Sequence, residues 1–343
     1  MKDGRVTNCF NTIRLLAALH VVWIHAATLF ELSDNWGIGK ILAFFPGVPV
    51  FFVLSGYCIW FSICRSTSFG EYCKKRFWRI YPELWLAVAI ELVTIMIFFK
   101  GHLDWLRFLA FAVGQGTIVP FWTPDFLRGY GCGTPNGVLW TIFALVQFYL
   151  LAYPVYKMLR CAKLMRWIFF ILALIAVSVG FNYGSKYMPV FVFKIGAISC
   201  VPYLWIFVLG AFFAEFQEQL VPIIAKHWYL PVVLRGAMLF VGVPSIPVFN
   251  YGFLSTIVAA VAVLAIGYRF PVLNIKKDIS YGIYIYHMTV INVMLVLGLS
   301  GGTCVLYFMA VVITCALSYI STITVGAYCQ NMKTKGWTKK SRA

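Results

Sequence analysis

Long apolar stretches separated by short polar ones run along the whole chain. A helix of about 20 apolar residues spans the hydrocarbon core of a bilayer. We predict ten such helices, at residues 13–30, 41–63, 81–99, 138–156, 166–181, 197–213, 229–248, 251–268, 281–299 and 303–327. Within lipid, a single segment can satisfy its own backbone hydrogen bonds only as a helix. The pattern therefore predicts an all-α, polytopic integral membrane protein, with one transmembrane domain over residues 1–343.

One further apolar stretch does not fit the spanning pattern. Residues 103–121 are interrupted by polar residues and glycines, namely Asp104, Arg107, Gly114, Gln115 and Gly116. Charged side chains are costly inside a bilayer, and they are rare in spanning helices. We expect this stretch to be interfacial or re-entrant rather than an eleventh span.

The composition supports a membrane protein. Of the 343 residues, 62% are hydrophobic and 11% are charged, whereas about a quarter of the residues of soluble domains are charged. A soluble core of this size cannot bury so much apolar surface. The composition therefore excludes the soluble globular class, and we expect a multi-pass protein of the inner (plasma) membrane.

Lysines and arginines gather in loops that an even number of spans places on one side of the membrane. Loops of this kind resist translocation and mark the cytoplasmic side. The clusters are Lys2, Arg5 and Arg14; Arg65, Lys74, Lys75, Arg76 and Arg79; Lys157, Arg160, Lys163 and Arg166; Arg269, Lys276 and Lys277; and Lys333, Lys335, Lys339, Lys340 and Arg342. We therefore predict that both termini are cytoplasmic.

This orientation, together with contact to anionic lipid, accounts for the net charge of +17. Nucleic acid is not an expected partner, because no soluble domain organises the basic residues into one surface. The ten cysteines include no CxxC spacing, so we expect no metal site.

Ionisable residues within the predicted spans are few, and each needs a structural or chemical reason. They are Arg14, His20, His25, Glu83, Glu91 and His287. Arg14 and His25 are eleven positions apart, which places them within about 20° of one helix face and about 16 Å apart along the axis. A permanent cation and an imidazole on one face suit an anionic substrate and a general base. The structural alternative for His25 is an interhelical hydrogen bond.

Two other stretches allow both a structural and a functional interpretation. The second span begins with Pro46, Gly47 and Pro49, and it contains Gly56. These residues favour either close helix packing through small side chains or a discontinuous helix that lines a cavity. At the start of the third span, Arg76 and Arg79 share a face if the segment is helical. They could clamp a phosphate or pyrophosphate, or they could anchor the span at the cytoplasmic surface.

Five stretches in order along the chain resemble the acyltransferase 3 family. Residues 14–25 resemble its Arg and His separated by ten residues, and 51–56 read Phe-Phe-Val-Leu-Ser-Gly, similar to its Phe-Phe-x-x-Ser-Gly. Residues 76–82 resemble its Arg-x-x-Arg-x-Tyr-Pro. Residues 139–150 are similar to a tryptophan and aromatic segment, and 279–287 to a late Ser-Tyr and Tyr-x-x-His element. The resemblance covers nearly the whole chain.

The resemblance implies a membrane O-acyltransferase that acylates polysaccharide, lipopolysaccharide or a related glycan. Acetyl-CoA or another short acyl-CoA would be the donor, and a cell-surface or lipid-linked saccharide the acceptor. The site residues that it implies are His25 and Arg14 for catalysis; Arg76, Arg79, Ser55 and Gly56 for the donor; and Tyr81, Trp140, Tyr149, Tyr284 and His287 in other roles. His25 would act as a general base or as a transient acyl carrier.

One departure from the family pattern limits what is carried over. Many members have a glutamate after the tryptophan, where this chain has Leu145 and Val146. No role of that carboxylate can therefore be assigned to this chain.

Two other function classes fit the composition. A transporter or flippase for a lipid-linked sugar would also have many spans, broken helices and a few intramembrane charges. Paired broken segments in the two halves of the chain are not evident, and the polar residues concentrate in the first three spans. A sensor or structural protein would leave the Arg14 and His25 alignment unexplained.

Overall fold

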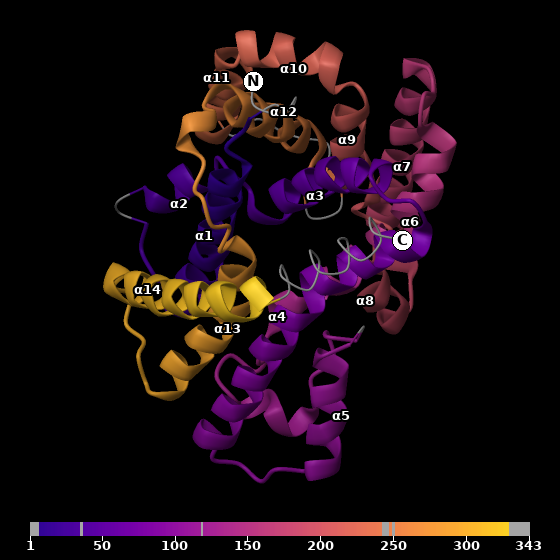
Figure 1. Cartoon of the computed structure of the whole chain (residues 1–343). Helices are drawn as coiled ribbons and strands as arrows, with labels where there is room; N and C mark the ends of the chain where they lie inside the picture. Colours follow the sequence, from indigo (N-terminus) through magenta and orange to yellow (C-terminus); the bar gives the residue numbers. More distant parts are fainter. Residues whose placement is uncertain (1–6, 35–36, 118, 242–246, 249–250, 329–343) are drawn as a thin grey trace. The chain divides into compact units, whose positions relative to one another are not determined.

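The computed structural model describes residues 7–34, 37–117, 119–241, 247–248 and 251–328 (Figure 1). Lys2, Arg5, the basic residues after residue 328, and residues 242–246 of the seventh predicted span lie outside the described residues. Within the described residues, the regular secondary structure is helical except for one pair of two-residue strands. The predicted all-α class is therefore confirmed. The cytoplasmic location of the termini stays a prediction.

Helices follow one another along the chain, with one short pair of strands late in the order. The elements are α1 Phe10–Leu29, α2 Ile38–Leu42, α3 Gly47–Cys64, α4 Phe69–Phe98, α5 Trp105–Gln115, η1 Asp125–Gly129, η2 Gly137–Leu139, α6 Trp140–Leu159, α7 Leu164–Gly184, η3 Ser185–Tyr187, α8 Val190–Ile198, α9 Leu204–Glu215, α10 Gln217–Lys226, α11 Tyr229–Val241, β1 Pro247–Val248, β2 Tyr251–Gly252, α12 Phe253–Arg269, η4 Pro271–Leu273, α13 Ser280–Val296, α14 Cys304–Ser321 and η5 Thr322–Gly326.

Six helical segments among the described residues are long and apolar enough to cross a membrane. A seventh span is possible if α9 and α10, which meet at an angle of 95°, are counted together. The remaining three predicted spans correspond to the shorter apolar helices α11, α12 and α13. The chain is thus a multi-pass membrane protein, and the number of about ten crossings stays a prediction.

The third span begins earlier than the sequence suggested. The apolar pattern places this span at residues 81–99, but α4 is helical from Phe69 through Phe98 and contains Pro82. Proline cannot donate to the carbonyl four residues before it, yet in α4 it does not end the helix. Arg76 and Arg79 therefore lie on a helix and share a face, as their spacing required.

The chain forms two compact units. Among the residues that the structure describes, the first lies within 7–17, 40–72 and 143–276, and the second lies within 18–39, 73–142 and 277–328. The expectation of a single transmembrane domain over residues 1–343 stays a prediction.

Within the first unit, α3 packs closely against α9 through two glycines. A Cβ on Gly56 would overlap the carbonyl oxygen of Phe207, and a Cβ on Gly210 would overlap that of Val53. Small residues allow two helix backbones to approach to this distance in a membrane. Gly56 therefore has the packing role that was one of the two interpretations of the second span.

The other interpretation, an interrupted helix, applies just before α3. The helix is broken at residues 43–46, between α2 and α3. Arg235 of α11 binds the released backbone: its Nη2 donates to the Ala43 carbonyl at 2.6 Å, and its Nε to the Phe44 carbonyl at 3.5 Å. Its Nη1 donates to Ser255 Oγ at 2.6 Å. Arg235 is only 4% exposed, and it was not among the residues predicted from the sequence to be important.

We expect the Arg235→Met variant to lose about 2 to 4 kcal/mol of stability, because two carbonyls in a buried setting lose their donor. Thermal unfolding of the purified protein in detergent measures this loss. Arg166→Met, at an exposed position of α7, is the matched control and should change stability by about 0.5 kcal/mol or less. Equal melting temperatures for the two variants would contradict this role of Arg235.

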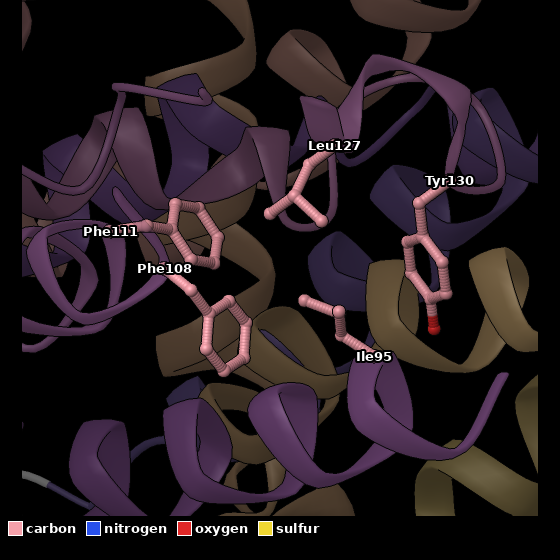
Figure 2. Packing of buried hydrophobic residues seen from close by; sticks show 5 residues of the cluster. All are labelled: Ile95, Phe108, Phe111, Leu127 and Tyr130. Atoms are coloured by element: carbon pink, nitrogen blue, oxygen red, sulfur yellow. The ribbon is translucent and has the colours of Figure 1, made fainter. Parts of the chain in front are cut away.

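In the second unit, α13 and α14 pack side by side (Figure 1). The short helix α5 packs on the end of α4 through Phe108 and Phe111, which meet Ile95, Leu127 and Tyr130 in one buried cluster (Figure 2). With 11 residues, α5 is about 16 Å long, which is too short to cross a bilayer. This agrees with the expectation that residues 103–121 are not an eleventh span.

Candidate active site

Two histidines from opposite ends of the chain meet within the second unit. Nε2 of His287 on α13 lies 3.1 Å from Nδ1 of His25 on α1, and the ring centroids are 5.1 Å apart. Both residues were singled out from the sequence, but nothing in the sequence indicated that they contact each other. We call them the histidine pair.

Hydrogen bonds assign the neutral tautomers of the histidine pair. Nδ1 of His287 lies 3.2 Å from the Ile283 carbonyl oxygen, and a carbonyl can only accept, so this nitrogen carries the proton. Nε2 of His287 is then an acceptor for Nδ1–H of His25, which also faces the Val21 carbonyl oxygen at 3.0 Å. His25 is left with an unprotonated Nε2, the form that a general base requires.

The histidine pair is held by a buried polar contact on α13. His287 is fully buried, and the ring of Tyr284 packs edge-on against it with centroids 6.1 Å apart. The hydroxyl of Tyr284 accepts from Thr141 Oγ1 at 2.9 Å and donates to the Val138 carbonyl at 3.2 Å. Tyr284 therefore joins the segment around Trp140 to the helix that carries His287.

A second group of site residues lies where α13 begins. Nη2 of Arg79 pairs with Oδ2 of Asp278 at 3.3 Å. Oδ1 of Asp278 accepts from the backbone N–H and the hydroxyl of Ser280, at 3.1 and 2.5 Å. The carboxylate of Asp278 is thus fixed by the start of α13, and it orients the half-exposed guanidinium of Arg79. Arg76 lies one helical turn before Arg79.

Close packing ties this end of α13 to α4 and α14. A Cβ on Gly282 would overlap Ser318 Oγ and would lie 3.0 Å from Glu83 Oε1. The same Glu83 oxygen accepts from Ser321 Oγ at 3.1 Å, and the hydroxyl of Tyr281 donates to the Ile80 carbonyl at 3.1 Å. Glu83 therefore has a structural role at the contact of three helices.

Other candidate residues lie in the first unit. Arg14, on the same helix as His25 and eleven residues before it, donates through Nη2 to the sulfur of Cys58 at 3.1 Å. Ser55 and Gly56 lie on α3. The carbonyl of Tyr149 accepts from the Tyr72 hydroxyl at 3.0 Å.

Tyr81 lies on α4 within the second unit. Its ring stacks on that of Phe77 with centroids 4.9 Å apart and packs against Trp85 at 5.9 Å. These contacts place Tyr81 in an aromatic group on one helix, and its role in the site stays a prediction.

Three residues that organise the second unit were not among those predicted from the sequence. Asp278 could have been found, because an aspartate two residues before a serine at a helix start is a common turn signal. Asn136 and Asn292 had no such signal: both amides bind backbone groups more than 140 residues away in the chain. Only the folded arrangement reveals them.

Comparison with known proteins decides the family. Residues 7–323 match the family described as an acyltransferase domain. The chain belongs to the acyltransferase 3 family. The resemblance drawn from the five motifs is therefore confirmed over nearly the whole chain.

Three known proteins are similar in sequence to this acyltransferase. It is 29% identical over 321 residues to nodulation protein 10 of Rhizobium leguminosarum, covering 86% of this chain and 85% of that protein. An O-acetyl transferase of Shigella phage Sf6 is 37% identical over 92 residues, 27% of each chain. A peptidoglycan O-acetyltransferase of Listeria monocytogenes is 26% identical over 150 residues, 40% of this chain and 22% of that protein. No solved structure matches the acyltransferase.

Family membership establishes the class of activity. The acyltransferase is a membrane O-acyltransferase, so the enzyme class predicted from the motifs is confirmed and the transporter alternative is set aside. An enzyme of this class requires an acyl donor.

Proposed function

We propose that this acyltransferase moves an acetyl group from cytosolic acetyl-CoA to a hydroxyl of a cell-surface or lipid-linked glycan in the inner (plasma) membrane. The observation that carries the proposal is the histidine pair, because its hydrogen bonds leave Nε2 of His25 unprotonated. The names of two relatives support acetyl as the transferred group. One of them is named for peptidoglycan, which supports a saccharide acceptor.

The chemistry follows from the weakness of a hydroxyl as a nucleophile at neutral pH. Nε2 of His25 takes the hydroxyl proton while the acceptor oxygen attacks the carbonyl carbon of the thioester. The carbon–sulfur bond breaks, and the leaving thiolate of coenzyme A takes the proton from His25. Nδ1–H of His25 donates to His287 throughout the reaction. This hydrogen bond stabilises the imidazolium that His25 forms after it takes the hydroxyl proton and before it gives the proton to the thiolate.

His25 could instead carry the acyl group itself for part of the cycle. In that alternative Nε2 of His25 attacks the carbonyl carbon of the thioester, the carbon–sulfur bond breaks, and the thiolate of coenzyme A leaves. The acceptor hydroxyl then attacks the acyl-imidazole, the carbon–nitrogen bond breaks, and the hydroxyl proton passes to the released Nε2. Rapid acid quenching followed by mass spectrometry of the peptide that contains His25 distinguishes the two routes. A mass increase of one acetyl group would support the carrier route.

The phosphates of acetyl-CoA are proposed to bind Arg76 and Arg79. A guanidinium suits bidentate contact with phosphate. The guanidinium of Arg79 is oriented by its ion pair with Asp278. For the remaining site residues we propose the roles that the family pattern implies. These residues are Arg14, Ser55, Gly56, Tyr81, Trp140, Tyr149 and Tyr284.

The donor assignment has a kinetic consequence. We expect Arg76→Gln and Arg79→Gln each to raise the KM for acetyl-CoA about tenfold with little change in kcat, because each loses a charge-assisted hydrogen bond. Initial rates of the purified enzyme over a range of acetyl-CoA concentrations measure this. Lys74→Gln, on the exposed face of the same helix, is the matched control and should leave KM unchanged. If the arginine variants behave like the control, the two arginines are anchors only.

The function itself is tested in two ways. Purified protein is incubated with labelled acetyl-CoA and with membranes from a strain that lacks the gene, without any ion gradient. Ester formation on a glycan supports an enzyme that acts alone, whereas no labelled product would contradict the proposal. Mass spectrometry of surface glycans from wild-type and deletion strains then identifies the acceptor and the acyl group, including the alternative of succinyl.

A further inference from the structure

Lys277 lies just before α13 and has no role in the reaction proposed above. The next residue, Asp278, is bound by Arg79 of α4. The ammonium of Lys277 contacts Tyr319 of α14 instead: its Nζ donates to the Tyr319 hydroxyl at 3.5 Å and lies 5.0 Å from the centroid of that ring. A cation is attracted to the face of an aromatic ring, so Tyr319 holds this ammonium in place.

The short stretch of backbone before α13 is joined to both α4 and α14. Arg79 reaches Asp278 from α4 at 3.3 Å. On α14, the hydroxyl of Ser318, which directly precedes Tyr319, donates to the carbonyl of Ile279 at 2.6 Å. Successive Cα atoms are about 3.8 Å apart, so the two helices meet this stretch at neighbouring residues. The guanidinium of Arg79 and the ammonium beside Tyr319 are therefore both held at this stretch, within the second unit.

At this stretch the cations are exposed and the carboxylate is covered. The side chain of Arg79 is 46% exposed, and that of Asp278 is only 13% exposed. The same carboxylate also accepts from the backbone N–H and the hydroxyl of Ser280. Lys277 is exposed, and Tyr319 is 47% exposed. An approaching anion therefore meets a guanidinium, an ammonium and a phenol, all of which can donate hydrogen bonds.

The acyl donor carries two kinds of phosphate group. Acetyl-CoA has a pyrophosphate and, on the 3′ oxygen of its ribose, a separate phosphate monoester. Guanidinium groups suit bidentate contact with phosphate, and two are proposed above for the donor. A phosphate monoester carries a charge of about −1.5 to −2 at pH 7 and has three acceptor oxygens. A compact ammonium with a hydroxyl beside it suits such a group, because both can donate to it.

We propose that Lys277 and Tyr319 bind the ribose 3′-phosphate of acetyl-CoA, so that the enzyme prefers this donor to its 3′-dephospho form. This inference rests on the proposed function, since it names the part of that donor which the two side chains recognise. The 3′-phosphate lies at the opposite end of acetyl-CoA from the thioester. Loss of either side chain should therefore raise the KM for acetyl-CoA and leave kcat nearly unchanged.

The test compares acetyl-CoA with acetyl-3′-dephospho-CoA as donors for the purified full-length protein, with membranes of the deletion strain as the acceptor source. The KM of the wild type should be about fivefold higher for the dephospho donor, because that donor cannot form the charge-assisted hydrogen bond to Lys277. Lys277→Gln should raise the KM for acetyl-CoA about fivefold and leave the KM for the dephospho donor unchanged. Lys277→Arg should keep most of the preference, whereas Tyr319→Phe should lose part of it.

Lys276→Gln is the matched control, because it removes the same charge from the adjacent exposed residue and leaves the contact between Lys277 and Tyr319 in place. Both of its KM values should match those of the wild type. Equal use of the two donors by the wild type would overturn the inference and leave the proposed function standing. So would a Lys277→Gln variant whose two KM values are both unchanged or both raised alike. If the wild type transfers acetyl from neither donor, the proposed function itself fails, and the inference fails with it.

Discussion

His25→Ala should lower acyl transfer by about a thousandfold, the range that loss of a general base causes. The variant removes Nε2 of His25, which takes the proton of the acceptor hydroxyl. It also removes Nδ1 of His25, which contacts Nε2 of His287. The purified variant is assayed with labelled acetyl-CoA and membranes of the deletion strain. In cells, mass spectrometry should show that the glycan ester disappears while the protein stays in the membrane at the normal level.

His20 provides the control for this variant. It lies on the same helix five residues earlier, about 140° away around the axis. His20→Ala should keep most of the activity, because it alters a histidine of α1 without touching the histidine pair. Persistence of the ester in cells that carry His25→Ala would refute the assignment of His25 as the base.

Replacing His287 by phenylalanine should lower kcat by about a hundredfold with little change in the KM for acetyl-CoA. Phenylalanine keeps the ring volume but removes the acceptor for Nδ1–H of His25, so the base loses its orientation and its charged form loses a partner. A small misplacement of a catalytic group costs a factor of this size. Initial rates measured against donor concentration separate the two kinetic constants.

A conservative variant distinguishes orientation from packing. The amide oxygen of His287→Gln can accept the hydrogen bond from His25, so this variant should recover about a tenth or more of the wild-type kcat. A merely structural role predicts the reverse order, with the phenylalanine variant the more active because the position is fully buried. That order would show that His287 does not act through His25.

The sequence predicted the fold class well, because apolar runs of membrane length allow few structures. It placed the start of the third span at residue 81, whereas α4 begins at Phe69 and includes the basic residues Lys74 to Arg79. They form a helix all the same, since lysine and arginine are good helix formers and their charged ends can reach the membrane surface.

The candidate site was predicted only in part. His25 and His287 stood out because each is costly in a membrane, but their contact spans 262 positions of sequence and has no local signal. Arg235 was overlooked because its reason to be buried, the broken backbone at residues 43–46, lies far away in the chain. Local patterns thus indicated which residues are unusual, and only tertiary structure indicated what they bind.

The reciprocal contact of Gly56 and Gly210 bears on how loss-of-function variants are interpreted. Gly56 belongs to a motif that marks the family, so inactive substitutions there invite the conclusion that it touches the donor. Yet any side chain at either glycine pushes α3 and α9 apart. A screen that scores only the missing ester would therefore find Gly56 and Gly210 as a matched pair, although Gly210 lies outside every motif. The amount of protein in the membrane separates such assembly defects from catalytic ones.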